Sequence, residues 1–296
     1  MNRRDFMKNT SLAVAGSILA APNLGFEKRH SFGIQLYSVR DDMKKAPLST
    51  LKELAKMGYN YVEGYGYNNR KWQGAHDLKQ MKMWLAEAGL TMPSSHFVLK
   101  STDFDKSKGD FTDDFKRMIE DAQAVGQKYF VSSSIIKQDM ANLDAFKNLC
   151  DVMNKTGELF RKNGLKLGYH NHEFEFDKLG EETMFDVMLK NVEPKNLTIQ
   201  MDMGWVVYAN NNPIDWFKKY PKRFELSHMK DGNKRGTTDK KHTSCIIGQG
   251  DVDFKGILAN KKQAGLKMLI VEIEDYVVSP LADSKACLDN FKKLVI

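Results

Sequence analysis

One pattern of hydrophobic and polar positions repeats along most of the chain. An amphipathic segment ends in glycine, and a short apolar stretch follows within a few residues. The pattern is clearest at Gly58, Gly89, Gly126, Gly164 and Gly265. Glycine just past a helix end closes the last turn in the left-handed conformation. Strands that alternate with helices in this way predict βα units and a parallel sheet.

Eight such strands can be counted. They cover residues 31–39, 59–66, 91–98, 128–134, 165–172, 197–205, 224–231 and 268–275. Helical patterns fill the gaps, for instance over residues 48–57, 77–88, 113–124, 143–162 and 279–294. Eight βα units within about 270 residues predict an α/β fold, a single-domain (β/α)8 TIM barrel over residues 27–296. An open doubly wound sheet is the alternative, disfavoured because no GxGxxG loop follows the first strand.

The first 26 residues are set apart from these units. The twin arginines Arg3 and Arg4 precede a small and apolar run over residues 11–21, and Ala20 and Ala21 suit a cleavage site. The run has the length of a signal-peptide core and is too short to span a bilayer. We expect a twin-arginine signal peptide over residues 1–26, export to the periplasm, and no membrane span after processing. An uncleaved membrane anchor is the alternative.

Composition and charge narrow the class of partner. The 296 residues are 42% hydrophobic and 28% charged, which is ordinary for a globular protein. The formal charge of +7 falls to about +5 once the three basic and one acidic residue of the leader are removed. The remaining lysines are spread among acids, without a basic stripe carrying aromatics, so we expect no nucleic-acid partner. The cysteines Cys150, Cys245 and Cys287 have no metal-binding spacing.

Imidazoles and carboxylates gather at the predicted carboxyl ends of the strands, where barrel enzymes hold their active sites. The densest stretch, KLGYHNHEFEF over residues 166–176, contains His170, His172, Glu173 and Glu175. Other strand ends add Glu63, His96, Asp202, His228, Lys230, Asp231, Glu272 and Glu274. Neutral imidazole and carboxylate are ligands that zinc and manganese prefer. Parallel barrel strands should be almost wholly apolar, so these polar residues favour a metal site.

Each of these residues has a structural alternative when it is taken alone. His96 could be a hydrogen-bonded core histidine, Glu63 could pair with a lysine at the rim, and Lys230 could be solvated. Glu173 is expected to face outward more readily than inward. The pattern across strands five to eight, each ending in at least one ligand, favours the metal site over these alternatives.

Five motifs then resemble a known family. YHNHEFEF, MDMGW, SHMKDG, GQGDVDFKGI and VEIED, with the opening GIQLYSVRDDM, resemble the sugar phosphate isomerase/epimerase family of xylose isomerase-like TIM barrels. The resemblance covers essentially the whole chain after the leader. It implies one divalent ion (Mn, Zn or Co) at the ends of strands five to eight. The residues that correspond to the family's ligands are Glu175, Asp202, His228 and Glu272.

The family's pattern decides between neighbouring acids. It favours Glu175 over Glu173 after the YHNH motif. It favours Glu272 over Glu274 in VEIED, where Ile273 replaces the amide that the family commonly has.

The resemblance also implies catalytic roles. His172 is similar to a general acid/base, and Lys230 to a cation oriented toward the substrate. Glu274 is the expected second carboxylate. Substrate-binding residues are expected at Tyr37, Glu63, His96, His170 and Trp205.

Such a site would bind two oxygens of an α-hydroxyketone. The ion would stabilise the enediolate that forms when the α-proton leaves, and His172 has the intrinsic pKa of a base near neutrality. Return of the proton gives an isomerase/epimerase, which is our first expectation. Loss of a β leaving group gives a lyase/hydrolase that cleaves keto-sugar glycosides, which is the alternative. Export and the lack of a glycine-rich phosphate loop predict an unphosphorylated sugar.

Two further classes complete the expectations. A non-catalytic carbohydrate-binding barrel would need no stoichiometric ion. A DNA-repair endonuclease branch of the superfamily carries several zinc ions, and it is disfavoured here by export and by the lack of a basic groove. Barrels of this kind often pair, so a homodimer is a further expectation.

Overall fold

A computed structural model describes residues 31–236 and 244–295 of the chain. The signal peptide predicted over residues 1–26 lies outside the described residues. Within the described part, no helix combines the length and the apolar character needed to cross a membrane.

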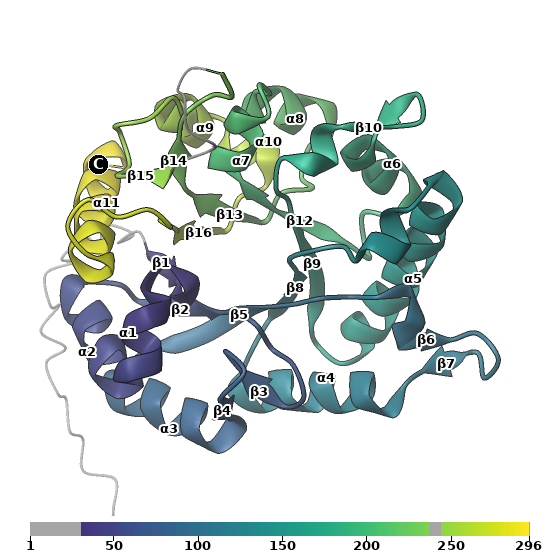
Figure 1. Ribbon diagram of the computed structural model, residues 1–296, viewed down its shortest axis with the longest axis horizontal. Coiled ribbons are helices and arrows are strands. Elements are labelled where there is room, and N and C mark those ends of the chain that lie inside the picture. Colours follow the sequence, from purple (N-terminus) through teal and green to yellow (C-terminus); the bar gives the residue numbers. More distant parts are fainter. Residues whose placement is uncertain (1–30, 237–243, 296) are drawn as a thin grey trace, which may run out of the picture. The chain divides into compact units, whose positions relative to one another are not determined.

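Eight parallel strands form a closed barrel (Figure 1), which confirms the predicted TIM barrel. Each strand pairs with the next barrel strand along the chain, and the last pairs with the first through Gly33 and Ile270. The strands are β1 (Gly33–Gln35), β2 (Tyr61–Gly64), β5 (Thr91–Phe97), β8 (Tyr129–Ser132), β9 (Lys166–His170), β12 (Thr198–Asp202), β13 (Leu226–Met229) and β16 (Met268–Val271).

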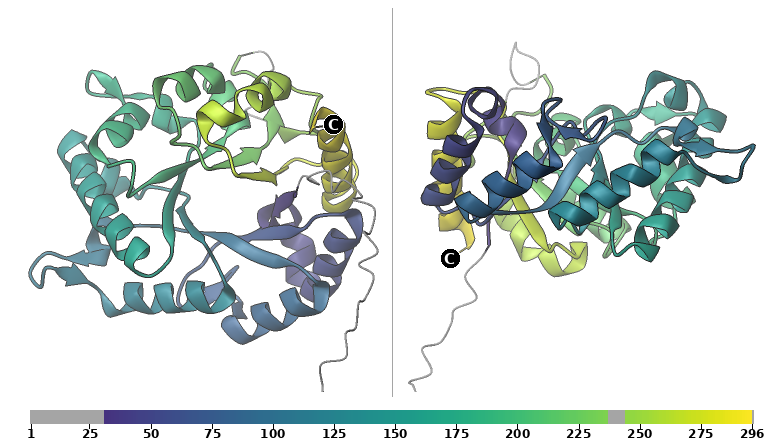
Figure 2. Two further views of the ribbon diagram at one scale, coloured as in Figure 1. Left: turned by 180° about the vertical axis from the view of Figure 1, so that it is seen from behind. Right: turned by 90° about the horizontal axis from the view of Figure 1, so that it is seen from below.

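The helices surround the barrel (Figures 1 and 2), and α11 lies beside α1 and α2 where the ring closes. They are α1 (Arg40–Lys45), α2 (Pro47–Met57), α3 (Leu78–Ala88), α4 (Asp113–Val125), α5 (Leu143–Lys162), α6 (Met184–Asn191), α7 (Met203–Tyr208), α8 (Pro213–Lys219), α9 (Phe254–Ala259), α10 (Lys261–Ala264) and α11 (Pro280–Val295). Gly58 and Gly126 close α2 and α4 in the left-handed conformation, with φ of 105° and 88°, as the repeated pattern predicted.

Short 3-10 turns and two-stranded hairpins lie in the connections between the barrel strands and the helices. The 3-10 turns are η1 (Leu36–Val39), η2 (Ser101–Asp103), η3 (Lys137–Met140) and η4 (Phe174–Phe176). Four small hairpins, absent from the sequence-based prediction, pair β3 (Lys71–Trp72) with β4 (His76–Asp77), β6 (Phe104–Asp105) with β7 (Asp110–Phe111), β10 (Lys178–Leu179) with β11 (Glu182–Thr183), and β14 (Asp231–Gly232) with β15 (Ser244–Cys245).

Several strands end earlier than predicted, and side-chain caps are the reason at two of them. The Gln35 side chain accepts a hydrogen bond from the backbone of Tyr37, which begins η1 directly after β1. The Asp202 side chain accepts one from Trp205, which begins α7 directly after β12. A side-chain acceptor at this position satisfies a free helical N–H, so the chain leaves the sheet and turns into a helix.

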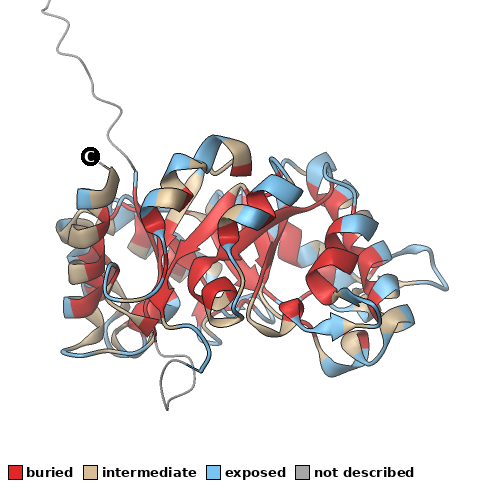
Figure 3. Cartoon of the chain, turned by 90° about the horizontal axis from the view of Figure 1, so that it is seen from above, coloured by how far each residue is buried: buried red, intermediate tan, exposed pale blue. Residues whose placement is uncertain are grey.

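The buried residues form two apolar clusters. The larger one includes residues from the barrel strands and from the helices around them, and Figure 3 shows the strands and the inner helix faces as buried. The smaller one consists of Tyr61, Tyr129, Val131, Leu226 and Ile270, contributed by four barrel strands. Successive side chains of a strand alternate between its two faces. The residues two positions further along three of these strands are therefore on the same face, and they are Glu63, His228 and Glu272.

A glycine inside α5 provides a test of the packing between a helix and the barrel. A Cβ atom on Gly157 would lie 2.1 Å from the backbone oxygen of Asn196. We expect Gly157→Ala to lower the free energy of unfolding by about 1–3 kcal/mol, because overpacking outweighs the gain of about 1 kcal/mol in helix propensity. Urea denaturation followed by circular dichroism measures the change. The exposed neighbour Glu158→Ala is the control, with an expected change within about 0.5 kcal/mol. A stabilised Gly157→Ala variant would contradict the close contact.

Candidate active site

Three buried side chains from neighbouring strand ends form a compact group of possible metal ligands. Asp202, His228 and Glu272 offer one ligand atom each, and these atoms lie within 4.8 Å of one another. Asp202 ends β12 beside His228 in β13, and Glu272 directly follows β16. His228 Nδ1 lies 2.9 Å from Glu272 Oε2 and 3.7 Å from Asp202 Oδ2. The structure thus brings together three of the four ligands that the resemblance implied.

The orientation of Asp202 follows from its place at the start of α7. Its Oδ1 accepts the Trp205 N–H at 3.0 Å, and its own N–H donates to Asn171 Oδ1 at 3.1 Å. Its Oδ2 is buried and has no hydrogen bond in the described part of the chain. Buried carboxylate oxygens are normally satisfied. An oxygen in this position, beside an imidazole and a second carboxylate, fits a divalent ion.

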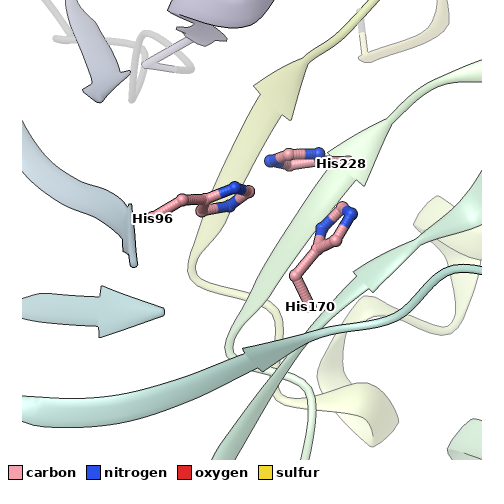
Figure 4. Close-up of side chains that lie close together, drawn as sticks. All are labelled: His96, His170 and His228. Atoms are coloured by element: carbon pink, nitrogen blue, oxygen red, sulfur yellow. The ribbon is translucent and has the colours of Figure 1, made fainter. Parts of the chain in front are cut away.

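Three histidines gather next to this group. The rings of His96, His170 and His228 come from three different strands and face the same space (Figure 4). The ring centroid of His170 lies 4.6 Å from that of His228 and 5.0 Å from that of His96. Burial lowers the pKa of His170 well below its usual value. His170 is therefore a neutral imidazole, which is the form that ligates a metal.

The structure places Glu175 away from the ligand group. Its Oε1 accepts the Tyr169 hydroxyl at 2.6 Å, and its Oε2 accepts the backbone N–H of His172 at 2.8 Å. Burial raises the pKa of Glu175 to about 8, against these two hydrogen bonds. The η4 turn after β9 points this carboxylate back toward the strand, so His170 occupies the place beside His228 that was expected for Glu175. Glu173 precedes the same turn and also belongs to neither group of ligands among the described residues.

A second set of side chains lies against the indole of Trp205. The His172 ring centroid is 5.5 Å from that of Trp205, and Lys230 Nζ is 4.9 Å from it. His172 Nδ1 is buried without a hydrogen bond to the described residues. Burial lowers the pKa of His172 to about 4, with a contribution from Lys230 and against the carboxylates of Asp202 and Glu272. His172 is therefore a neutral imidazole at pH 7.

Lys230 is a fully buried cation. Its ammonium group bonds Glu274 and lies 3.2 Å from Glu272 and 3.5 Å from Asp202. Burial lowers the pKa of Lys230, but these three carboxylates outweigh it and raise the pKa above its usual value. Both acids of VEIED contact Lys230, but among the described residues only Glu272 belongs to a ligand group.

The remaining predicted residues fall into two places. Glu63 and His96 are buried in the barrel and bonded to other side chains. Tyr37 lies in η1 and is 38% exposed, with the Arg40 guanidinium 4.5 Å from its ring. Arg40 also donates to the Tyr276 hydroxyl at 2.7 Å.

Two polar residues of the site were not selected from the sequence. Gln200, inside β12, accepts from His96 Nε2 at 2.6 Å and contacts His170 Nδ1 at 3.2 Å. Asn171 bonds both the N–H and the C=O of Asp202 and so joins the ends of β9 and β12. The polar residues within the buried strand β12 were the available signal for Gln200.

Metal binding can be tested by its effect on stability. We expect added Mn²⁺ to raise the free energy of unfolding by about 2.7 kcal/mol at one hundred times its Kd, because the ion binds only the folded chain. Thermal melting with and without chelator measures this. Asp202→Asn should abolish the stabilisation while keeping the cap on α7, and His170→Ala should weaken it.

Glu175→Gln is the control variant, and it should retain the Mn²⁺ stabilisation because Glu175 lies outside the ligand group. Loss of the effect in Glu175→Gln, with retention in His170→Ala, would favour the ligand set that the resemblance implied.

Comparisons with known proteins show which family and which fold this chain resembles. The family model described as a xylose isomerase-like TIM barrel matches residues 51–294. An inosose dehydratase from Clostridium perfringens (strain 13 / Type A) is 26% identical over 155 residues, which are 47% of this chain and 52% of that protein. The match to this curated relative thus spans about half of its length.

Two solved structures are similar to the barrel. A sugar phosphate isomerase/epimerase from Parabacteroides distasonis ATCC 8503 superposes with a TM-score of 0.72 at 25% identity, over 89% of this chain and 98% of that one. The IOLI protein, whose structure contains a zinc atom, superposes with a TM-score of 0.66 at 16% identity, over 90% and 98%. With its family match extending over most of its length, the chain belongs to the xylose isomerase-like TIM barrel family.

Proposed function

We propose that this protein is a metal-dependent lyase that expels a group β to the ketone of an unphosphorylated keto-sugar or keto-polyol. The observation that carries the proposal is the pairing of two unlike proton-transfer groups beside the ligand group. His172 is a neutral imidazole and Lys230 an ammonium, and both lie against Trp205. Elimination needs a base for the α-proton and a donor for the leaving oxygen. The name of the inosose dehydratase relative describes a reaction of this type, the loss of water from a keto-polyol.

Asp202, His228 and Glu272 would hold the ion, with His170 adjacent. When bound, the ion supplies Lewis acidity toward the ketone oxygen and so stabilises the negative charge that develops there. His172 takes the proton from the α-carbon, and the electron pair of that bond forms the carbon–carbon double bond. The carbon–oxygen bond at the β position breaks, and the oxygen leaves as water or an alcohol with a proton from Lys230. His172 then loses its proton to solvent, and Lys230 regains a proton from solvent, so both groups return to their starting protonation states.

Isomerisation or epimerisation is the second candidate. It is favoured by the likeness to the sugar phosphate isomerase/epimerase from Parabacteroides distasonis. The first step is the same, but the proton returns to carbon, with Glu274 as the second carboxylate. Both reactions share the ion and His172, and the presence or absence of a leaving group on the substrate decides between them.

The charge of the site supports an unphosphorylated substrate. Asp202, Glu272 and Glu274 surround the ammonium of Lys230, so these four groups carry a net charge of −2. A divalent ion would bring the sum to zero and leave no surplus positive charge to bind a phosphate. Export by the twin-arginine route, proposed from the sequence of residues 1–26, would place the protein in the periplasm and points the same way.

The test is to incubate the Mn²⁺-loaded protein with inosose and with 3-keto-glucosides in deuterated water. We expect an α,β-unsaturated ketone, detected by its ultraviolet absorbance, and release of water or the aglycone. His172→Ala should lower the rate about 10²- to 10⁴-fold, because the base is removed. His76→Gln is the control with an unchanged rate, because His76 lies in the β3–β4 hairpin against Trp84.

Other outcomes select other functions. Deuterium at carbon without a leaving group would establish the isomerase/epimerase. Sugar binding without turnover by the metal-loaded protein would support the non-catalytic carbohydrate-binding barrel.

A further inference from the structure

Glu63 is a buried carboxylate with four hydrogen-bond partners inside the barrel, and the proposed reaction does not use it. It lies in β2 and is fully buried. Its Oε1 contacts Gln35 Nε2 at 2.9 Å, His228 Nε2 at 2.6 Å and His96 Nε2 at 3.2 Å. Its Oε2 accepts Gln200 Nε2 at 2.7 Å and the Ser94 hydroxyl. Both oxygens are therefore enclosed by side chains, which leaves Glu63 no face for a substrate.

The Glu63 carboxylate fixes which nitrogen of His228 is free. An ionised carboxylate only accepts hydrogen bonds. The side chains of Gln35, Gln200 and Ser94 all donate to the two Glu63 oxygens, so Glu63 is an acceptor on both. His228 Nε2 must therefore carry a proton toward Glu63. The other nitrogen, Nδ1, is the one that faces Glu272 and Asp202, so it can present its lone pair there.

The same carboxylate acts on His170 through Gln200. Because Glu63 accepts, the Gln200 amide nitrogen faces it, and the Gln200 carbonyl oxygen faces His96 and His170. That oxygen also only accepts. His170 Nδ1 must then carry a proton, at 3.2 Å from Gln200 Oε1. The lone pair of His170 is left on Nε2.

We propose that Glu63 is a positioning residue that sets the tautomers of both His228 and, through Gln200, His170, and so prepares them to ligate the metal ion. The proposal rests on the metal site of the proposed function. It adds Glu63, which is not itself one of the proposed ligands. Metal-bound histidines commonly donate their other N–H to a carboxylate or carbonyl, which fixes the ring and raises its basicity. Here one carboxylate serves two rings, one directly and one through an amide.

This arrangement also accounts for the group of three histidines in Figure 4. His96 Nε2 donates to Gln200 Oε1 and lies near Glu63 Oε1. The ring is thereby engaged in the same network, and its position beside His170 and His228 needs no second ion.

The experiment measures the Kd for Mn²⁺ alone, from the electron paramagnetic resonance signal of the free ion. In Glu63→Gln the amide nitrogen cannot accept, so it opposes one of the surrounding donors. We expect the Kd to rise about 10- to 100-fold, the usual effect of losing such a partner. Ser94→Ala is the matched control, because it removes one donor from Glu63 without touching either histidine. Its Kd should stay within about threefold of the wild-type value.

Nitrogen-15 NMR of the histidine rings, with Zn²⁺ bound, is the second readout. The wild type should show His228 protonated on Nε2 and His170 on Nδ1, and Glu63→Gln should lose this pattern. If Glu63→Gln does not fold, Gln200→Met takes its place, and it should raise the Kd and alter the protonation pattern of His170 but not that of His228.

The outcomes are distinct. A wild type that holds no Mn²⁺ removes the proposed function. A wild type that binds Mn²⁺ with an equal Kd in Glu63→Gln, or with an equal loss in Ser94→Ala, overturns the role of Glu63 and leaves the metal site standing. Two Mn²⁺ ions per wild-type chain, one of them lost in Glu63→Gln, would make Glu63 a ligand and would also overturn the positioning role.

Discussion

The alternation of side chains along the strands of a closed barrel is the constraint on which the site depends. Every second residue of each strand points inward, and the barrel has no other place for these side chains. At the amino-terminal end the inward positions hold Tyr61, Tyr129, Leu226 and Ile270, which pack together. Two residues further along, three of these strands carry Glu63, His228 and Glu272. The apolar layer thus forms the floor of the barrel interior, and the polar layer lies directly above it.

Burying so many polar groups has consequences for their neighbours. A charge removed from water is tolerated only when it is paired or bound to an ion. Lys230 meets Asp202, Glu272 and Glu274, and Glu63 meets its ring of donors. The two networks share His228, whose Nε2 contacts Glu63 and whose Nδ1 contacts Glu272. His228 therefore links the inner network to the residues at the mouth, and its substitution should disturb both.

The sequence predicted the eight strands and the left-handed glycines because these depend on local patterns. Asp202, His228 and Glu272 were candidates because each lies on or just after a strand whose end faces the mouth. The family resemblance then selected them as ligands from the other acids at these ends. The assignment of Glu175 as a ligand, in preference to Glu173, rested on the family's pattern alone. It depended on how the chain turns in η4, where the backbone of His172 and the hydroxyl of Tyr169 hold the carboxylate.

Contacts between side chains across the barrel could not be predicted from the sequence, for a different reason. Glu63 and Gln200 are 137 residues apart and come from strands that do not pair. Their hydrogen bond depends on the closure of the barrel and on the lengths of the two side chains. The hydrophobic periodicity of the sequence contains no information about either. The early ends of β1 and β12 depend likewise on side-chain caps from Gln35 and Asp202.

The apolar cluster of Tyr61, Tyr129, Val131, Leu226 and Ile270 closes the barrel on one side of the site. Tyr61 bonds the backbone of Leu269 through its hydroxyl, and Tyr129 bonds Glu225, which Lys166 and Lys267 also hold. A barrel whose interior is packed in this way is not an open pore. Whatever enters must therefore depart along the path by which it came, so substrate and product compete for one route. In a cleavage reaction, the fragment nearer the opening has to leave before the fragment beneath it.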